Sequence, residues 1–152
     1  MDNLFLSHFY FILQFILLGV FYLKLYENDT LKQVAKLIII LTIAVLGIQY
    51  IITPEVFFKF NLFEINLTSL VLVTFSAIYF TKSLKKQKQF LYVNSGVFIY
   101  LLSSALIFST GNLMKELDKS VNKIIWQVNA FLYVFFQILI FIEWYKNYRI
   151  KT

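Results

Sequence analysis

Five long apolar segments, separated by short polar connectors, are the feature of this sequence that most limits its fold. A helix that crosses the hydrocarbon core of a bilayer needs about 20 mostly apolar residues, and each segment has about that length. Transmembrane β-strands have about 10 residues and alternate apolar with polar side chains, which these segments do not. We therefore predict an all-α integral membrane bundle of five transmembrane helices, forming a single membrane domain over residues 1–152. The segments cover approximately residues 4–25, 34–52, 60–80, 90–110 and 124–145.

The composition excludes several classes of protein. The chain is 60% hydrophobic and 14% charged, whereas soluble domains are about 45–50% apolar and about 25% charged. An ordinary soluble domain and a disordered chain are both excluded, because disorder requires low hydrophobicity. The net charge is +6, but the basic residues lie in short connectors, so we expect a lipid bilayer as the partner and no nucleic acid. With no cysteine and one histidine, we expect no metal site and no cofactor.

The distribution of basic residues predicts the orientation. Cytoplasmic loops of membrane proteins are enriched in Lys and Arg. With the N-terminus outside and the C-terminus inside, the inner connectors and tail carry Lys24, Lys32, Lys36, Lys82, Lys85, Lys86, Lys88, Lys146, Arg149 and Lys151. The outer connectors then carry only Lys59, Lys115, Lys119 and Lys123. No Lys or Arg precedes the first segment, so we interpret it as an uncleaved span.

Polar side chains recur in the outer third of the predicted spans. Candidate ligand-binding residues of this outer polar layer are His8, Gln49, Glu64, Asn66, Gln127 and Asn129. They either line a pocket that opens to the outside, or lie at the interface and satisfy one another. Glu64 is the most informative, because an unpaired carboxylate inside a span is costly. Its expected partner is His8 or an outer lysine; if the third span begins later, Glu64 is an outer-loop charge.

Two helix faces are candidates for packing or for a partner helix. In the fourth segment, small residues that let helices approach closely share a face with Tyr100; this face includes Gly96, Tyr100, Ser103 and Ser104. In the fifth segment a stripe of Trp126, Tyr133, Gln137 and Trp144 indicates an inward face. Glu143 is interpreted as a surface ion pair with Lys146, three residues further on, or as a contact with lipid head groups.

The fourth and fifth segments also resemble a known helix pair. The residues that carry the resemblance are Tyr92, Asn94, Ser95, Gly96, Tyr100, Gly111, Asn112, Trp126 and Asn129. They resemble a pair in small multi-span proteins of Bacteroidota that are similar to the membrane sensor regions of histidine kinases. The resemblance implies a sensor or accessory module without an output domain, since no kinase domain follows Thr152.

The sequence therefore predicts a non-catalytic membrane protein. No Gly-rich phosphate loop, paired carboxylates or Ser-His-Asp arrangement is visible, so we expect no enzyme activity. The leading hypothesis is a sensory or accessory module of the bacterial inner membrane that acts through a membrane protein partner or as a homo-oligomer. The alternatives are a small subunit of a transporter or channel, and a structural subunit of a membrane complex.

Overall fold

The computed structural model describes residues 5–83, 90–114 and 119–149, and these residues form helices with no strand among them. The elements are α1 (Phe5–Leu25), α2 (Asp29–Ile52), the short 3₁₀ helix η1 (Pro54–Phe58), α3 (Leu62–Ser83), α4 (Leu91–Met114) and α5 (Lys119–Tyr148). Each of the five α-helices is long and apolar enough to cross a membrane. The predicted all-α fold with five candidate spans is confirmed; the orientation and the single domain stay predictions. Lys85, Lys86 and Lys88 lie outside the described residues, as does the side chain of Lys82.

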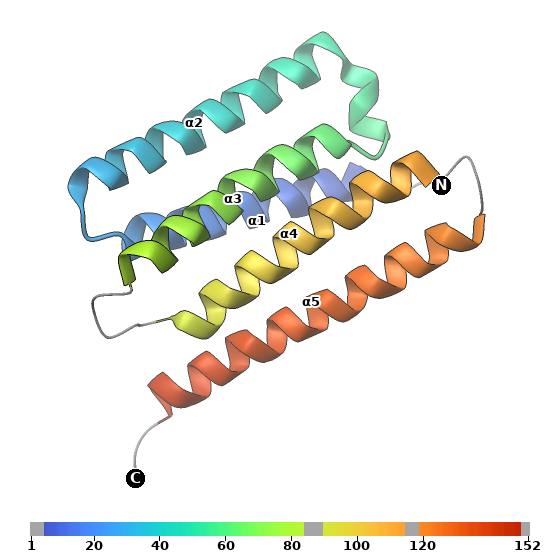
Figure 1. Cartoon of the computed structure of the whole chain (residues 1–152). Helices are drawn as coiled ribbons and strands as arrows, with labels where there is room; N and C mark the ends of the chain where they lie inside the picture. Colours follow the sequence, from blue (N-terminus) through green and yellow to red (C-terminus); the bar gives the residue numbers. More distant parts are fainter. Residues whose placement is uncertain (1–4, 84–89, 115–118, 150–152) are drawn as a thin grey trace. The chain divides into compact units, whose positions relative to one another are not determined.

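The chain divides into two compact units, residues 1–75 and 76–152. The first unit holds α1, α2, η1 and most of α3, and the second holds the end of α3, α4 and α5. In Figure 1, α1 and α2 run side by side, as do α4 and α5. Short connectors make such sequential neighbours antiparallel.

In the first unit, specific residues end and begin the helices. The Asn28 side chain accepts a hydrogen bond from the Leu31 backbone N–H at 2.9 Å and so caps the start of α2. Pro54 follows the end of α2 and begins η1, because proline lacks an N–H and its φ angle suits the first position of a helix. The Tyr26 hydroxyl donates to the Phe75 carbonyl at 2.8 Å, which ties the end of α1 to α3.

In the second unit, α4 packs against α5 at the small-residue face of the fourth segment. A Cβ atom added to Gly96 would lie 2.5 Å from the Phe136 ring, so only glycine allows this approach. The Tyr100 and Phe136 rings stack with centroids 5.5 Å apart. Ser104 donates to the Asn129 side chain at 2.8 Å. Gly96, Tyr100 and Ser104 therefore join α4 to α5, whereas Ser103 is half-buried.

The stripe predicted as an inward face of α5 is largely exposed, and its role as a packing or partner face stays a prediction. Among the side chains of α5 that the structure describes, Phe136 and Glu143 are buried, whereas Trp126 and Trp144 are about half exposed and Gln137 is exposed. One residue turns a helix by about 100°, so Gln137 points well away from the side that Phe136 presents to α4. Two members of the stripe contact α4: Trp126 meets Phe108 and Tyr133 meets Tyr100 in edge-to-face contacts.

Glu143 is not a surface ion pair. Its side chain is only 4% exposed and accepts hydrogen bonds from the backbone N–H groups of Phe90 at 3.1 Å and Tyr92 at 2.8 Å. These N–H groups lie at the start of α4, where helix N–H groups lack partners within the helix. Lys146 instead donates to the Tyr92 hydroxyl at 2.5 Å and lies over its ring. A carboxylate on α5 thus caps α4.

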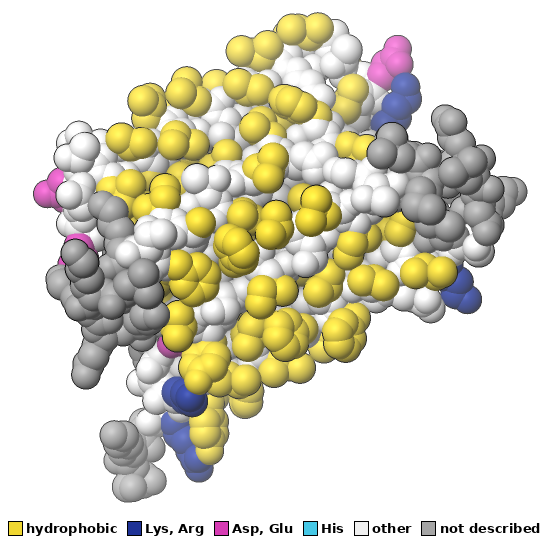
Figure 2. Space-filling model, in the orientation of Figure 1, with side chains coloured by type: hydrophobic (Ala, Val, Ile, Leu, Met, Phe, Trp, Pro, Cys, Tyr) yellow, Lys and Arg dark blue, Asp and Glu magenta, His cyan; other side chains and the backbone are white. Residues whose placement is uncertain are grey.

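The surface of the helices is largely apolar. Figure 2 shows hydrophobic side chains over the middle of the visible face, with basic and acidic side chains toward its ends. Large side chains such as Leu17, Ile40 and Phe131 are more than half exposed. This is the pattern expected where lipid surrounds a helix bundle, and it agrees with a membrane protein.

Candidate functional site

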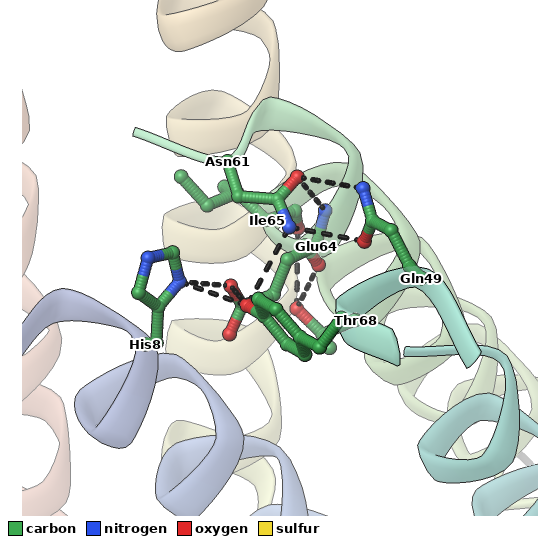
Figure 3. A network of polar contacts seen from close by, with 7 residues as sticks. His8, Gln49, Asn61, Glu64, Ile65 and Thr68 are labelled. Carbon is green, nitrogen blue, oxygen red and sulfur yellow. Dashed lines mark hydrogen bonds and ion pairs between the residues drawn. The ribbon is translucent and has the colours of Figure 1, made fainter. Parts of the chain in front are cut away.

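Buried polar side chains gather at one end of the first unit. We call His8, Gln49, Tyr50, Asn61 and Glu64 the polar cluster. His8 comes from the start of α1, Gln49 and Tyr50 from the end of α2, and Asn61 and Glu64 from the start of α3. The labelled members of the cluster point toward one another in Figure 3. His8 is 1% exposed and Glu64 is 0% exposed, so Glu64 lies inside α3 and is not an outer-loop charge.

Three side chains of the cluster form a closed triangle of short contacts. The Nδ1 atom of His8 lies 2.5 Å from Oε2 of Glu64. The Tyr50 hydroxyl donates to the same oxygen at 2.6 Å and lies 2.9 Å from the His8 Nδ1 atom. Short bonds of this kind are typical when a donor or acceptor is ionised. The predicted pairing of Glu64 with His8 is therefore present in the structure, and Tyr50 completes it.

Two amides connect the triangle to the backbone of α3. The Asn61 side-chain oxygen accepts from the Glu64 backbone N–H at 3.2 Å, which makes Asn61 the cap of α3. The Asn61 amide nitrogen donates to the Gln49 oxygen at 3.0 Å and lies 3.5 Å from the Tyr50 hydroxyl. Glu64 also occupies the first turn of α3, where the partial positive charge of the helix N-terminus favours a carboxylate.

An aromatic ring from η1 covers the imidazole of His8. The Phe57 ring stacks on the His8 ring with centroids 5.3 Å apart and an interplanar angle of 22°. The same Phe57 ring meets the Tyr50 ring edge-to-face at 5.9 Å. Just beyond it, Glu55 and Lys59 form an exposed ion pair at 3.2 Å. The triangle therefore lies beneath an apolar layer, within a few residues of charged side chains at the end of the unit.

Two buried atoms of the triangle have no hydrogen-bond partner among the described residues. They are the Nε2 atom of His8 and the Oε1 atom of Glu64. Burying an unpaired polar atom costs free energy, and unpaired buried groups are uncommon in folded proteins. One more proton can be placed on either of these atoms, because Nδ1 of His8 and Oε2 of Glu64 already bond to each other.

The other predicted members of the outer layer lie further along α3 or on α5. Asn66 is half-buried, two residues after Glu64 on α3. Gln127 is exposed on α5, and Asn129 accepts a hydrogen bond from Ser104 within the second unit. The structure thus joins three of the predicted residues, His8, Gln49 and Glu64. Their binding role, and that of the remaining three, stays a prediction.

Sequence reasoning overlooked two members of the cluster. Asn61 precedes Glu64 by three positions, and a capping residue followed at that distance by Glu is a known signal for the start of a helix. This signal places Asn61 at the N-terminus of α3. The hydroxyl contact of Tyr50 with Glu64 depends on how α2 packs, which no local pattern shows.

No protein-family model, curated protein or solved structure matches the chain. The resemblance to membrane sensor regions therefore stays a prediction.

Proposed function

We propose that the protein is a non-catalytic membrane module that binds one proton in the polar cluster and passes this change on through a membrane protein partner. The observation that supports the proposal is the buried triangle of His8, Tyr50 and Glu64 with its two unpartnered atoms. Ionisable residues buried in membrane helices are rare and often mark proton or ligand sites. Histidine is also the side chain whose charge ordinarily changes between about pH 5 and 8.

Counting protons shows why the cluster should respond to pH. With a neutral imidazole, an intact tyrosine hydroxyl and an ionised carboxylate, the triangle carries one negative charge. One added proton removes this charge, whether it resides on Nε2 of His8 or on Oε1 of Glu64. A buried net charge is costly, so the two states differ strongly in how well they tolerate burial. When Glu64 is ionised, the Tyr50 hydroxyl donates a hydrogen bond to it and so stabilises the carboxylate.

The position of the cluster supports a response to the pH of the solution outside the membrane. If the N-terminus is outside, as the basic residues predict, the start of α1 and the end of α2 lie on that side. The segment most directly affected is η1, because Phe57 covers the His8 ring. In the state with an uncompensated negative charge, this end of the unit should open more readily, since local opening hydrates the charge.

Hydrogen exchange of residues 53–61 tests the proposal in the full chain reconstituted in lipid nanodiscs. After correction for the chemical effect of pH, the wild type should exchange faster near pH 8 than near pH 5. Glu64→Gln removes the negative charge, so its corrected exchange should not be faster near pH 8 than near pH 5. Glu55→Gln is the matched control, because Glu55 lies in the same segment but its side chain is exposed; it should behave like the wild type.

Two results would argue against a proton-responsive module. One is corrected exchange in the wild type that is the same at both pH values. The other is a pH response that survives in Glu64→Gln but disappears in Glu55→Gln, which would assign it to the exposed ion pair.

A further inference from the structure

The exposed side of α5 carries a regular seam. Its residues are three or four positions apart in alternation, and all are exposed: Gln127, Ala130, Val134, Gln137, Phe141 and Trp144. Spacing of three and four residues keeps side chains on one line of a supercoiled helix and lets each fit between residues of a neighbouring helix. This seam includes part of the stripe that was predicted to face inward.

Two amides within the seam distinguish it from a surface that only contacts lipid. Gln137 lies near the middle of the candidate span Lys123–Asn147. Neither Gln127 nor Gln137 makes a hydrogen bond with another residue that the structure describes. In hydrocarbon an amide without a partner is costly. Polar side chains at such positions commonly bond to a facing helix and fix its register.

We infer that this seam is the contact surface for a second copy of the chain. Two copies inserted in the same direction place α5 beside α5 in parallel, and a two-fold axis brings identical residues to the same height. A glutamine amide carries both donors and an acceptor, so it is complementary to its own copy. Gln137 then bonds to the Gln137 of the second copy, and Ala130 lets the helices approach closely.

The inference rests on α5 alone and is independent of the proton-binding proposal. A chain that dimerises but does not respond to pH keeps this inference and loses the other. A monomer whose polar cluster titrates does the reverse.

Cysteine cross-linking tests the seam, because the chain has no native cysteine. In native membranes Val134→Cys should form a disulfide-linked dimer on mild oxidation. Val128→Cys is the matched control, since Val128 is exposed on the same helix but lies outside the seam. It should cross-link far less. Equal cross-linking at both positions, or none at position 134, would overturn the inference; in the latter case lipid or another protein covers the seam.

A second measurement isolates the amide. Gln137→Leu keeps the size and removes the hydrogen bond, so the dimer should dissociate about 3–30 times more readily in nanodisc or micelle dilution, given about 0.6–2 kcal/mol for an interhelical hydrogen bond. Ile138→Leu, at the next exposed position outside the seam, should leave association unchanged. An unchanged dimer in Gln137→Leu would contradict the pairing of the amides.

Discussion

The His8 imidazole and the Glu64 carboxylate are 56 residues apart in the sequence, yet their nearest atoms are 2.5 Å apart in a site that excludes solvent. Such a contact joins the start of α1 to the start of α3. The free energy of burying two ionisable groups is offset only when they are paired and further bonded, and Tyr50 supplies the additional bond to Glu64.

Removing one partner of this pair should therefore destabilise the protein strongly. His8→Leu leaves the buried carboxylate without its imidazole partner, and we expect the free energy of unfolding to fall by about 3–5 kcal/mol. The double variant His8→Leu with Glu64→Leu should recover much of this loss, because no buried charge remains. Unfolding in mixed micelles measures both. A double variant as unstable as the sum of the single variants would show that the two residues are not coupled.

Gly96 and Gly47 make a matched pair of glycine positions. Gly96→Ala should lower the free energy of unfolding by about 1–3 kcal/mol, since the added Cβ meets the Phe136 ring at 2.5 Å. Nothing lies within 4 Å of a Cβ added to Gly47, so Gly47→Ala should raise it by about 0.5–1 kcal/mol through better helix propensity. The same micelle assay compares them, and equal effects at the two positions would contradict the close approach of α4 to α5.

Glu143 should behave as a helix cap. Glu143→Ala removes the acceptor of the half-buried Phe90 and Tyr92 backbone N–H groups. We expect a loss of about 1.5–3 kcal/mol and faster hydrogen exchange at the start of α4. Lys146→Met is the control for charge at the end of α5. It should leave hydrogen exchange of the Tyr92 amide largely unchanged. If Lys146→Met and Glu143→Ala have the same effect on that amide, the capping role is wrong.

Tyr26 gives a prediction at alkaline pH. Burial raises the pKa of the Tyr26 hydroxyl above its ordinary value, so the folded protein favours the neutral form that donates to Phe75. This contribution is fully present below the pKa of the unfolded chain, about 10, and is lost as the pH rises above it. The wild type should thus lose stability above about pH 10 more steeply than Tyr26→Phe. The free energy of unfolding of both proteins, measured over a pH series, tests this prediction. Identical slopes of this free energy against pH would contradict the role of the buried hydroxyl.

The number and approximate positions of the helices could be predicted because they follow from local chemistry, although α2 and α5 each begin five residues before the predicted segments. Apolar segments of sufficient length predict the helices, and Pro54 marks the end of α2 within a residue or two. The orientation of side chains around α5 could not be predicted in this way. A helix with apolar residues on all sides gives no signal of which side meets α4, so the contact of Phe136 and Glu143 with α4 could not be predicted.

Part of the candidate site could also be predicted from local sequence. Depth along a span follows from sequence position, so His8, Gln49 and Glu64 could be placed in one layer. Their meeting depends on which helices are neighbours in the first unit, and Asn129 at the same predicted depth bonds instead to Ser104. Glu143 shows the limit most clearly, because its partners are backbone N–H groups more than 50 residues away.

Nitrogen-15 NMR of the histidine side chain is the most direct test of the central claim, that His8 and Glu64 share one titrating proton. The chain has a single histidine, so selective labelling gives the signals of His8 alone. We predict that a change of pH alters both the Nδ1 and the Nε2 signal of the wild type, because the added proton changes the bonding of the ring. This response should differ in Glu64→Gln, which removes the carboxylate partner, and should be the same in Glu55→Gln as in the wild type. Signals that do not change with pH, or a response that is the same in the wild type and in Glu64→Gln, would contradict the account.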